Sequence, residues 1–275
     1  RSWEFAPGKT AIMKSEQLNE IARALKEAQS VYLFPHIQMD GDCLGSSAAL
    51  CRALRSMGKS AYILVEDQVP EYLAFLGDGF ITGDSGIIKN PDVCMTVDCS
   101  TMDRFEKRKD GFFKGKTTIC LDHHITTQLF ADLNHIDPQS ASTAELAYKL
   151  IGKLGATSSP EIAEALYVGI MTDTGNFQYC NTTAETHRIV ADLYDWGLSQ
   201  QKVIIAVYQS VRPEKVRLSG AALSRMELFC GGKAAARVAG FGAVYPLDNA
   251  HAHLAGGDGE RLFLSVCHAL LSSFH

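Results

Sequence analysis

Four short segments rich in Asp and His begin where an apolar run or a helix is expected to end. They are residues 36–42 (HIQMDGD), 97–99 (VDC), 121–124 (LDHH) and 172–175 (TDTG). The first three directly follow apolar runs that are typical of buried strands. Because the carboxyl ends of parallel strands meet at one edge of a sheet, these segments are expected to converge there. Their placement constrains the fold and predicts one shared site.

Apolar runs of strand length alternate with segments of helical periodicity along most of the chain. The expected strands are residues 31–35, 61–65, 93–97 and 117–121. The expected helices are residues 13–28, 44–57, 70–76, 142–154, 160–171, 183–196 and 200–209. This alternation predicts an α/β fold with a mostly parallel sheet and helices on both faces.

The expected domain boundaries follow changes in this pattern. Residues 1–12 read unlike the rest and precede Met13, which resembles a natural start, so we expect them to be an artificial remnant outside the fold. Residues 13–209 form the expected main domain, and residues 210–229 a linker helix. Residues 230–275 are expected to form a smaller, incomplete α/β domain, with a strand at 234–238 and a closing helix at 262–271.

Composition argues against several classes of protein. The 275 residues carry a formal net charge of −5, whereas proteins that grip long duplex nucleic acid usually present a basic surface. We find no apolar run long enough to span a membrane and no N-terminal apolar core of the signal-peptide type. The eight cysteines include no C-x-x-C pair, which argues against a structural zinc site. We therefore expect a reduced, cytoplasmic protein that binds neither long duplexes nor membranes.

The four segments supply imidazole nitrogens and carboxylate oxygens, which are ligands that suit Mn²⁺, Zn²⁺ or Fe²⁺. The carboxylates of Asp40, Asp42, Asp98 and Asp173 would repel one another and any phosphate unless cations balance them. Two divalent ions would cancel these charges, and such pairs are typical of sites that hydrolyse phosphate esters. Gly45 and Ser46 follow the first of the four segments, residues 36–42, and open a helix whose N–H groups can bind a phosphate.

Simpler interpretations exist for each segment taken alone. A single Asp is more often a turn former or a helix N-cap than a metal ligand. The sequence Asp40-Gly41-Asp42 also suggests a calcium loop, but the Glu expected at position 12 of such a loop is absent. It is the combination of all four segments, at strand or helix ends, that favours a metal site.

With these motifs in place, the chain resembles the DHH phosphoesterase family, named for its Asp-His-His motif. Within that family it resembles the oligoribonuclease/pAp-phosphatase branch, also called nanoRNases. The resemblance covers approximately residues 18–209 and includes the segment 167–177 (YVGIMTDTGNF). Met39 departs from the pattern, because this branch usually has Pro there.

The resemblance implies a two-ion site, usually with Mn²⁺. The implied ligands are His36 and Asp40 for the first ion, Asp42, His123 and Asp173 for the second, and Asp98 for both. His124 is implied to contact the scissile phosphate and to stabilise its developing charge, and Asp122 to orient a histidine.

The resemblance also implies a second domain, called DHHA1, which normally grips the nucleotide with a Gly-Gly-Gly-His motif. Residues 253–259 (HLAGGDG) approach this motif but lack the following His, so we expect residues 230–275 to be a partial or divergent version of that domain. The candidate substrate contacts are Ser46, Arg104, His253, Gly256 and Gly257. For Arg104 the alternative is an ordinary surface ion pair.

The leading functional hypothesis is hydrolysis of short oligoribonucleotides to mononucleotides, with 3′,5′-pAp as a second substrate. The alternatives are a phosphodiesterase for cyclic di-AMP or pApA, and a nucleotide sensor or inactive truncated form. A manganese pyrophosphatase shares the metal motifs, but we do not find the Ser-Arg-Lys-Lys segment of that branch. The expected partner is a short single-stranded RNA or a small nucleotide, and homodimers are common in the family.

Overall fold

The computed structural model describes residues 7–77 and 79–210, together with short stretches between residues 213 and 246. The chain divides into two compact units, residues 1–209 and residues 210–275. Among the described residues, no helix combines the length and the hydrophobicity needed to cross a membrane.

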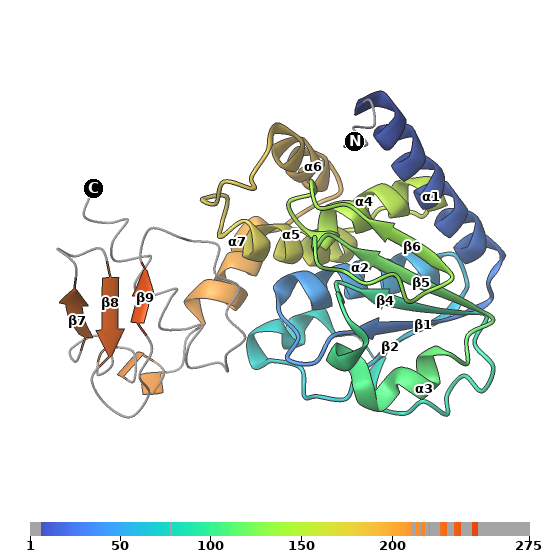
Figure 1. Ribbon diagram of the computed structural model, residues 1–275, viewed down its shortest axis with the longest axis horizontal. Helices are drawn as coiled ribbons and strands as arrows, with labels where there is room; N and C mark the ends of the chain where they lie inside the picture. The colour runs from blue at the N-terminus through green and yellow to red at the C-terminus, as the bar shows by residue number, and fades with distance from the viewer. Residues whose placement is uncertain are drawn as a thin grey trace, which may run out of the picture. The chain divides into compact units, whose positions relative to one another are not determined.

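The first unit is built on a six-stranded sheet in which every pair of neighbouring strands is parallel (Figure 1). Its strands are β1 (Ser30–Pro35), β2 (Ser60–Leu64), β3 (Ile81–Thr82), β4 (Val93–Val97), β5 (Thr117–Asp122) and β6 (Leu133–Ile136). Their order across the sheet is β3-β2-β1-β4-β5-β6. The mostly parallel α/β fold is therefore confirmed, and four of its strands match the expected ones.

Helices cover both faces of this sheet, but unequally. One face carries the long helices α1 (Pro7–Glu27), α2 (Gly41–Ser56), α4 (Thr143–Leu154), α5 (Pro160–Asp173) and α6 (Ala184–Asp195) (Figure 1). In the part of the chain that the structure describes, the other face carries the 3-10 helix η2 (Met102–Arg108) and the short α3 (Lys109–Phe112), which pack on Phe34 of β1. The remaining elements are the 3-10 helix η1 (Glu71–Leu76), α7 (Gln200–Ile204) and the π-helical turn η3 (Ile205–Gln209).

The side chains of β1 alternate between two apolar cores. Leu33 belongs to the large core beneath the long helices. Phe34 points the other way and packs on Phe112 at 5.5 Å and 86° between ring planes. Because every residue from Val31 to Pro35 is buried, β1 reads as an unbroken apolar run, as expected for a strand covered on both faces.

Two helix starts differ from the expected ones. α1 begins at Pro7, so part of residues 1–12 continues the first helix instead of lying outside it. α2 begins at Gly41, three residues before the apolar periodicity, because Asp40 caps it by accepting a hydrogen bond from the Cys43 N–H at 3.0 Å. Asp42 consequently lies within the first turn of α2 instead of in an extended loop.

The second unit contains a three-stranded antiparallel sheet, β7 (Met226–Phe229), β8 (Ala234–Arg237) and β9 (Val244–Pro246). β8 confirms the expected strand at residues 234–238. The linker helix was expected to reach residue 229, and this was wrong for Met226–Phe229, which pair with β8. Four residues are too few to separate a helical period from a strand period, so pairing decides. The expected helix at 262–271 lies outside the described residues.

α2 and α5 cross with almost no side-chain volume between them. A Cβ atom on Gly45 would lie 2.5 Å from the carbonyl oxygen of Ala165 in α5, and one on Gly169 would lie 2.7 Å from Asp42 Oδ1 in α2. Both distances are shorter than real Cβ contacts, so only glycine permits this approach. The crossing places the first turn of α2 near Asp173, the last residue of α5.

We expect Gly45→Ala to destabilise the protein by about 1–3 kcal/mol, because backbone atoms of α5 cannot yield to the added methyl group. Gly152→Ala is the matched control, since Gly152 is exposed inside α4 and its Cβ would meet nothing within 4 Å. That change should be neutral or stabilising by up to about 1 kcal/mol. Urea denaturation midpoints of the three proteins test this, and equal midpoints for the two variants would contradict it.

Candidate metal centre

The candidate site lies where the strand order of the parallel sheet reverses. β1 has β2 on one side and β4 on the other. His36 directly follows β1 and Asp98 directly follows β4, so both residues lie at the carboxyl edge of the sheet. In open α/β sheets, ligands bind in the crevice at this reversal point.

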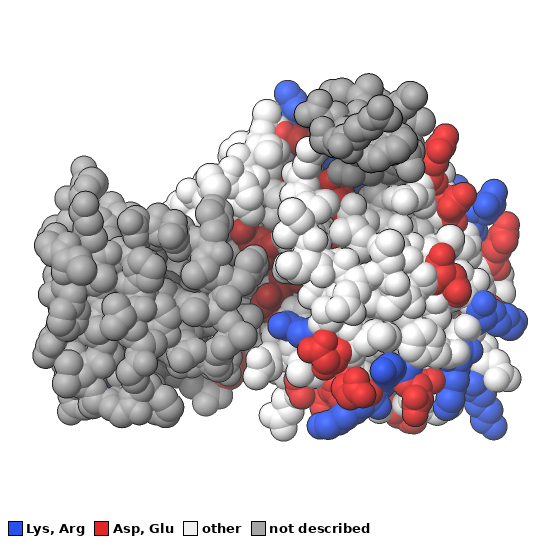
Figure 2. All heavy atoms as spheres, viewed as in Figure 1, with Lys and Arg blue, Asp and Glu red and all other residues white. Residues whose placement is uncertain are grey.

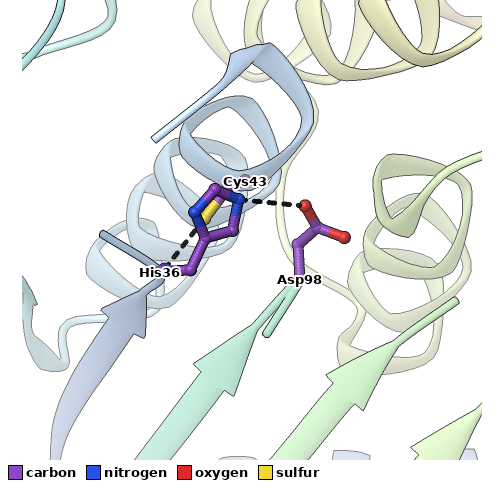
Figure 3. Close-up of side chains that lie close together, drawn as sticks. All are labelled: His36, Cys43 and Asp98. Atoms are coloured by element: carbon purple, nitrogen blue, oxygen red, sulfur yellow. Dashed lines mark hydrogen bonds and ion pairs between the residues drawn. The ribbon is translucent and has the colours of Figure 1, made fainter. Parts of the chain in front are cut away.

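His36 and Asp98 point toward each other from the ends of β1 and β4 (Figure 3). His36 Nε2 lies 3.7 Å from Asp98 Oδ2 and 3.8 Å from Asp40 Oδ2. Asp98 has a left-handed backbone with φ of 56°, which Asp adopts more readily than most residues. Asp40 uses Oδ1 to cap α2, while Oδ2 faces the site, so it is a helix cap and a candidate ligand at once.

A second group surrounds His123 and shares Asp98 with the first. His123 Nε2 lies 3.1 Å from Asp173 Oδ2 and 3.9 Å from Asp42 Oδ2. It also lies 3.7 Å from Asp98 Oδ1. The two oxygens of Asp98 therefore face different histidines, Oδ2 facing His36 and Oδ1 facing His123. A carboxylate in this position can bridge two cations.

The ring of His123 is oriented as a metal ligand would be. Its Nδ1 lies 3.3 Å from the Ser140 carbonyl oxygen, so we assign a proton to Nδ1. Its Nε2 is buried and makes no hydrogen bond of good geometry among the described residues. A carbonyl behind one ring nitrogen and a site in front of the other is the usual setting of a ligating histidine.

Two groups compete for Nδ1 of His36. The Ile37 carbonyl oxygen lies 2.6 Å away and requires a proton on Nδ1, whereas the Arg104 guanidinium lies 2.7 Å away and requires a lone pair. We assign the proton to Nδ1, because the Arg104 side chain can move and the backbone carbonyl cannot. Nε2 then presents its lone pair toward the Asp40 and Asp98 carboxylates.

Asp42 is held by the N-terminus of α4. Its Oδ2 accepts a hydrogen bond from the Thr143 N–H at 2.7 Å, and its Oδ1 accepts one from the Ala144 N–H at 2.9 Å. Ser46 adds a hydroxyl donor to Oδ1 at 3.1 Å. These are unpaired N–H groups of a helix start, where the helix dipole also favours negative charge.

Asp122 and His124 form a hydrogen-bonded pair at the end of β5, with His124 Nδ1 3.5 Å from Asp98 Oδ1. Asp122 Oδ1 accepts a hydrogen bond from His124 Nδ1 at 2.8 Å, and Oδ2 accepts one from the Thr127 hydroxyl at 2.6 Å. This hydrogen bond raises the pKa of His124 to about 9. Burial alone would raise the pKa of Asp122, but the bonds from His124 and Thr127 hold it below its ordinary value.

Burial raises the pKa values of the carboxylates around His123 in the metal-free protein. Burial, followed by the charge of Asp173, raises the pKa of Asp42 to about 7. Burial likewise raises the pKa of Asp173 to about 6, and that of Asp98 well above its usual range. Burial opposes protonation of His123, but the surrounding carboxylates outweigh it and raise its pKa to about 11.

These residues fit a pair of divalent cations. Ligands about 2.1 Å from one ion lie about 3–4 Å from one another, and the nitrogen-to-oxygen distances around His36 and His123 fall in that range. The four carboxylates of Asp40, Asp42, Asp98 and Asp173 match the charge of two such ions. All six ligands expected from the sequence therefore lie together in the described structure.

The expected substrate contacts have different outcomes. Ser46 is buried and donates to Asp42, so it lies behind a candidate ligand instead of at an open surface. Its role as a substrate contact stays a prediction. Arg104 reaches the edge of the site beside His36. His253, Gly256 and Gly257 lie outside the described residues.

Two residues at the site were not expected from the sequence. The Thr143 hydroxyl donates a hydrogen bond to Asp98 Oδ1 at 2.9 Å. The Cys43 thiol accepts one from the His36 N–H at 3.2 Å and lies 3.5 Å from the Val97 carbonyl oxygen, behind the His36 ring (Figure 3). Thr143 directly follows Ser142, the N-cap of α4, so its place at a helix start could be predicted from the sequence. For Cys43, the sequence offered only its position next to Asp42.

Charges on the surface of the described residues are mixed. On the face in Figure 2, Lys and Arg side chains are scattered among Asp and Glu side chains instead of gathering into one basic area. Taken with the net charge of −5, this face gives no electrostatic footprint for a long duplex.

Comparisons with known proteins agree on one family. The N-terminal domain model of the DHH family matches residues 30–170. The bifunctional oligoribonuclease and PAP phosphatase NrnA of Thermus thermophilus is 34% identical over 224 residues, covering 79% of this chain and 65% of the relative. The protein of the same name from Bacillus subtilis is 25% identical, covering 78% of this chain and 68% of the relative.

A solved structure shares the fold. The exopolyphosphatase-related protein from Bacteroides fragilis superposes with a TM-score of 0.74 at 27% identity, covering 78% of this chain and 66% of that protein. The chain therefore spans slightly less than two thirds of the Thermus and Bacteroides proteins.

We expect Mn²⁺ to raise the melting temperature more at about pH 8 than at about pH 6. Metal binding must displace protons from Asp42, Asp173 and His123, whose metal-free pKa values are raised, so affinity falls as pH falls. Calorimetry in buffers of different ionisation enthalpy should detect the released protons. Binding that is independent of pH, without proton release, would contradict these assignments.

We expect Asp98→Asn to weaken Mn²⁺ binding by more than about 100-fold, because this change removes the charge that both histidine groups share. Asp103→Asn is the control, since Asp103 is exposed in the segment that follows. Isothermal titration with Mn²⁺ checks both variants. Near-normal affinity in Asp98→Asn would show that this residue does not bridge.

Proposed function

The chain belongs to the DHH family, and from this premise we propose that it is a metal-dependent phosphoesterase. Its proposed substrates are short oligoribonucleotides, cleaved to mononucleotides, and 3′,5′-pAp, converted to AMP. The relatives from Thermus thermophilus and Bacillus subtilis are named for these two activities.

The observation that carries the proposal is the position of Asp98 between His36 and His123. One buried carboxylate with an imidazole nitrogen near each oxygen suits two neighbouring cations. The partly buried Asp92, by contrast, is surrounded by hydrogen-bond donors from Gln29, Ser30 and Lys116, whereas the Asp98 carboxylate accepts a hydrogen bond from Thr143 and otherwise faces histidines.

We take the two ions to be Mn²⁺, because mixed imidazole and carboxylate ligands suit it. The proposed ligands are His36 and Asp40 for one ion, Asp42, His123 and Asp173 for the other, and Asp98 for both. When bound, such a pair supplies a water made acidic enough to attack phosphorus near neutral pH.

His124 is the proposed contact to the scissile phosphate. Its side chain is 29% exposed, so a substrate can reach it, and Asp122 fixes the ring through Nδ1. The hydrogen bond to Asp122 raises the pKa of His124 to about 9 in the metal-free protein, which favours the positively charged ring. A fixed cation is placed to stabilise the negative charge that develops on the phosphate.

Arg104 is proposed as a second phosphate contact. Its guanidinium lies at the edge of the site, while its backbone carbonyl accepts a hydrogen bond from the Ile37 N–H at 2.8 Å. Binding of a phosphate there would also remove the competition for Nδ1 of His36. We further propose that the partner is a short single-stranded RNA or small nucleotide, in a cytoplasmic protein that forms homodimers.

Product analysis distinguishes this function from its competitors. The protein and Mn²⁺ would be incubated separately with pApA, pAp, cyclic di-AMP and pyrophosphate. We expect AMP from pApA and from pAp. Products only from cyclic di-AMP or only from pyrophosphate would contradict the proposal. Nucleotide-dependent thermal stabilisation without any product would identify a sensor instead.

We expect His124→Ala to lower kcat for pApA by about 100-fold or more while Mn²⁺ affinity stays near that of the unaltered protein, because His124 is proposed to act on phosphate and not on the ions. Asp98→Asn provides the contrast, since it should lose metal and turnover together. Kinetics at saturating Mn²⁺, with a parallel metal titration, separate the two effects. Loss of metal in His124→Ala would move this residue into the ligand set.

A further inference from the structure

We propose that Thr143 is a positioning residue that fixes Asp42 and Asp98 relative to each other and thereby sets the affinity of the site for divalent ions. This inference rests on the metal site in the proposed function. It assigns a role to the first residue of α4, which belongs to none of the Asp- and His-rich segments.

Thr143 is bonded to two candidate ligands from different elements. Its N–H donates to Asp42 Oδ2 at 2.7 Å, and its hydroxyl donates to Asp98 Oδ1 at 2.9 Å. Asp42 belongs to the start of α2 and Asp98 follows β4, so one small residue ties a helix to the end of a strand. Thr143 is fully buried, which shields both bonds from water.

The hydroxyl selects the rotation of the Asp98 carboxylate. Asp98 Oδ1 is the oxygen that faces His123 at 3.7 Å and His124 at 3.5 Å, while Oδ2 faces His36. A donor on Oδ1 holds the carboxylate so that one oxygen points to each histidine group. Without it, a buried carboxylate would lose a hydrogen bond and turn toward other donors.

Thr143 itself is held rigidly. The preceding Ser142 caps α4 by accepting a hydrogen bond from the Glu145 N–H at 3.3 Å. Glu145 is buried and accepts hydrogen bonds from the Ser140 hydroxyl at 2.9 Å and the Thr186 hydroxyl at 2.6 Å. The branched Thr side chain also has few rotamers at a helix start. Thr143 therefore bonds to the Asp42 and Asp98 carboxylates from a rigidly held position.

Three variants separate positioning from general stability. Thr143→Val keeps the shape and removes the hydroxyl, and Thr143→Ser keeps the hydroxyl. Thr118→Val is the matched control, because Thr118 is also buried and donates to a carboxylate, Asp132, at 2.8 Å. Thr118 lies near the start of β5, away from the carboxyl edge of the sheet.

The readout is Mn²⁺ binding to the full chain without nucleotide, by isothermal titration and by the electron paramagnetic resonance signal of free Mn²⁺. We expect Thr143→Val to lower affinity about 10–100-fold, Thr143→Ser to restore most of it, and Thr118→Val to leave it unchanged. Thermal unfolding of the metal-free proteins measures stability separately.

Each other outcome has a definite meaning. Normal Mn²⁺ affinity in Thr143→Val, or equal loss in Thr143→Val and Thr118→Val, would overturn the inference. If the unaltered protein bound no Mn²⁺, both the inference and the proposed function would fail. If it bound Mn²⁺, and Thr143→Val bound it more weakly, but no substrate were hydrolysed, only the proposed function would fail.

Discussion

The burial of Asp98 between two histidines is the constraint on which the rest of the site depends. A buried carboxylate is costly unless charges or hydrogen bonds compensate it, and here three further carboxylates lie nearby. In the metal-free protein the compensation comes from the histidines and from donors at the start of α4, and burial raises the pKa of Asp98 well above its usual range. Such a cluster of carboxylates favours cations, because positive charge offsets the cost of burying them.

The scaffold keeps these charges together through two features that carry no charge. Reversal of the strand order brings the ends of β1 and β4 side by side, which fixes His36 near Asp98. Close crossing of α2 and α5 at Gly45 and Gly169 then places Asp42 beside Asp173. A Cβ on Gly169 would lie 2.7 Å from Asp42 Oδ1, so this glycine permits the helix crossing and also leaves room for the Asp42 carboxylate.

The sequence predicted the candidate ligands better than the strands, helix caps and contacts that hold them in place. The candidate ligands could be predicted because Asp and His at the ends of apolar strands are uncommon without a purpose. β3 and β6 were missed because β3 is two residues long and β6 has only two apolar side chains among its four residues. The start of α2 at Gly41 was missed because it depends on the Asp40 cap, which apolar periodicity does not reveal. The contact of Thr143 with Asp98 joins residues far apart in sequence, and no local pattern encodes such a contact.

Local sequence alone determined that apolar strands alternate with helices, and that side chains able to bind metal ions stand at their ends, since both follow from side-chain type and spacing. Only the tertiary structure decided which oxygen of Asp98 faces which histidine, which ring nitrogens face the site, and that α4 braces two carboxylates. These properties depend on how separate elements pack, because distance and orientation between side chains arise from the whole fold and not from any one segment.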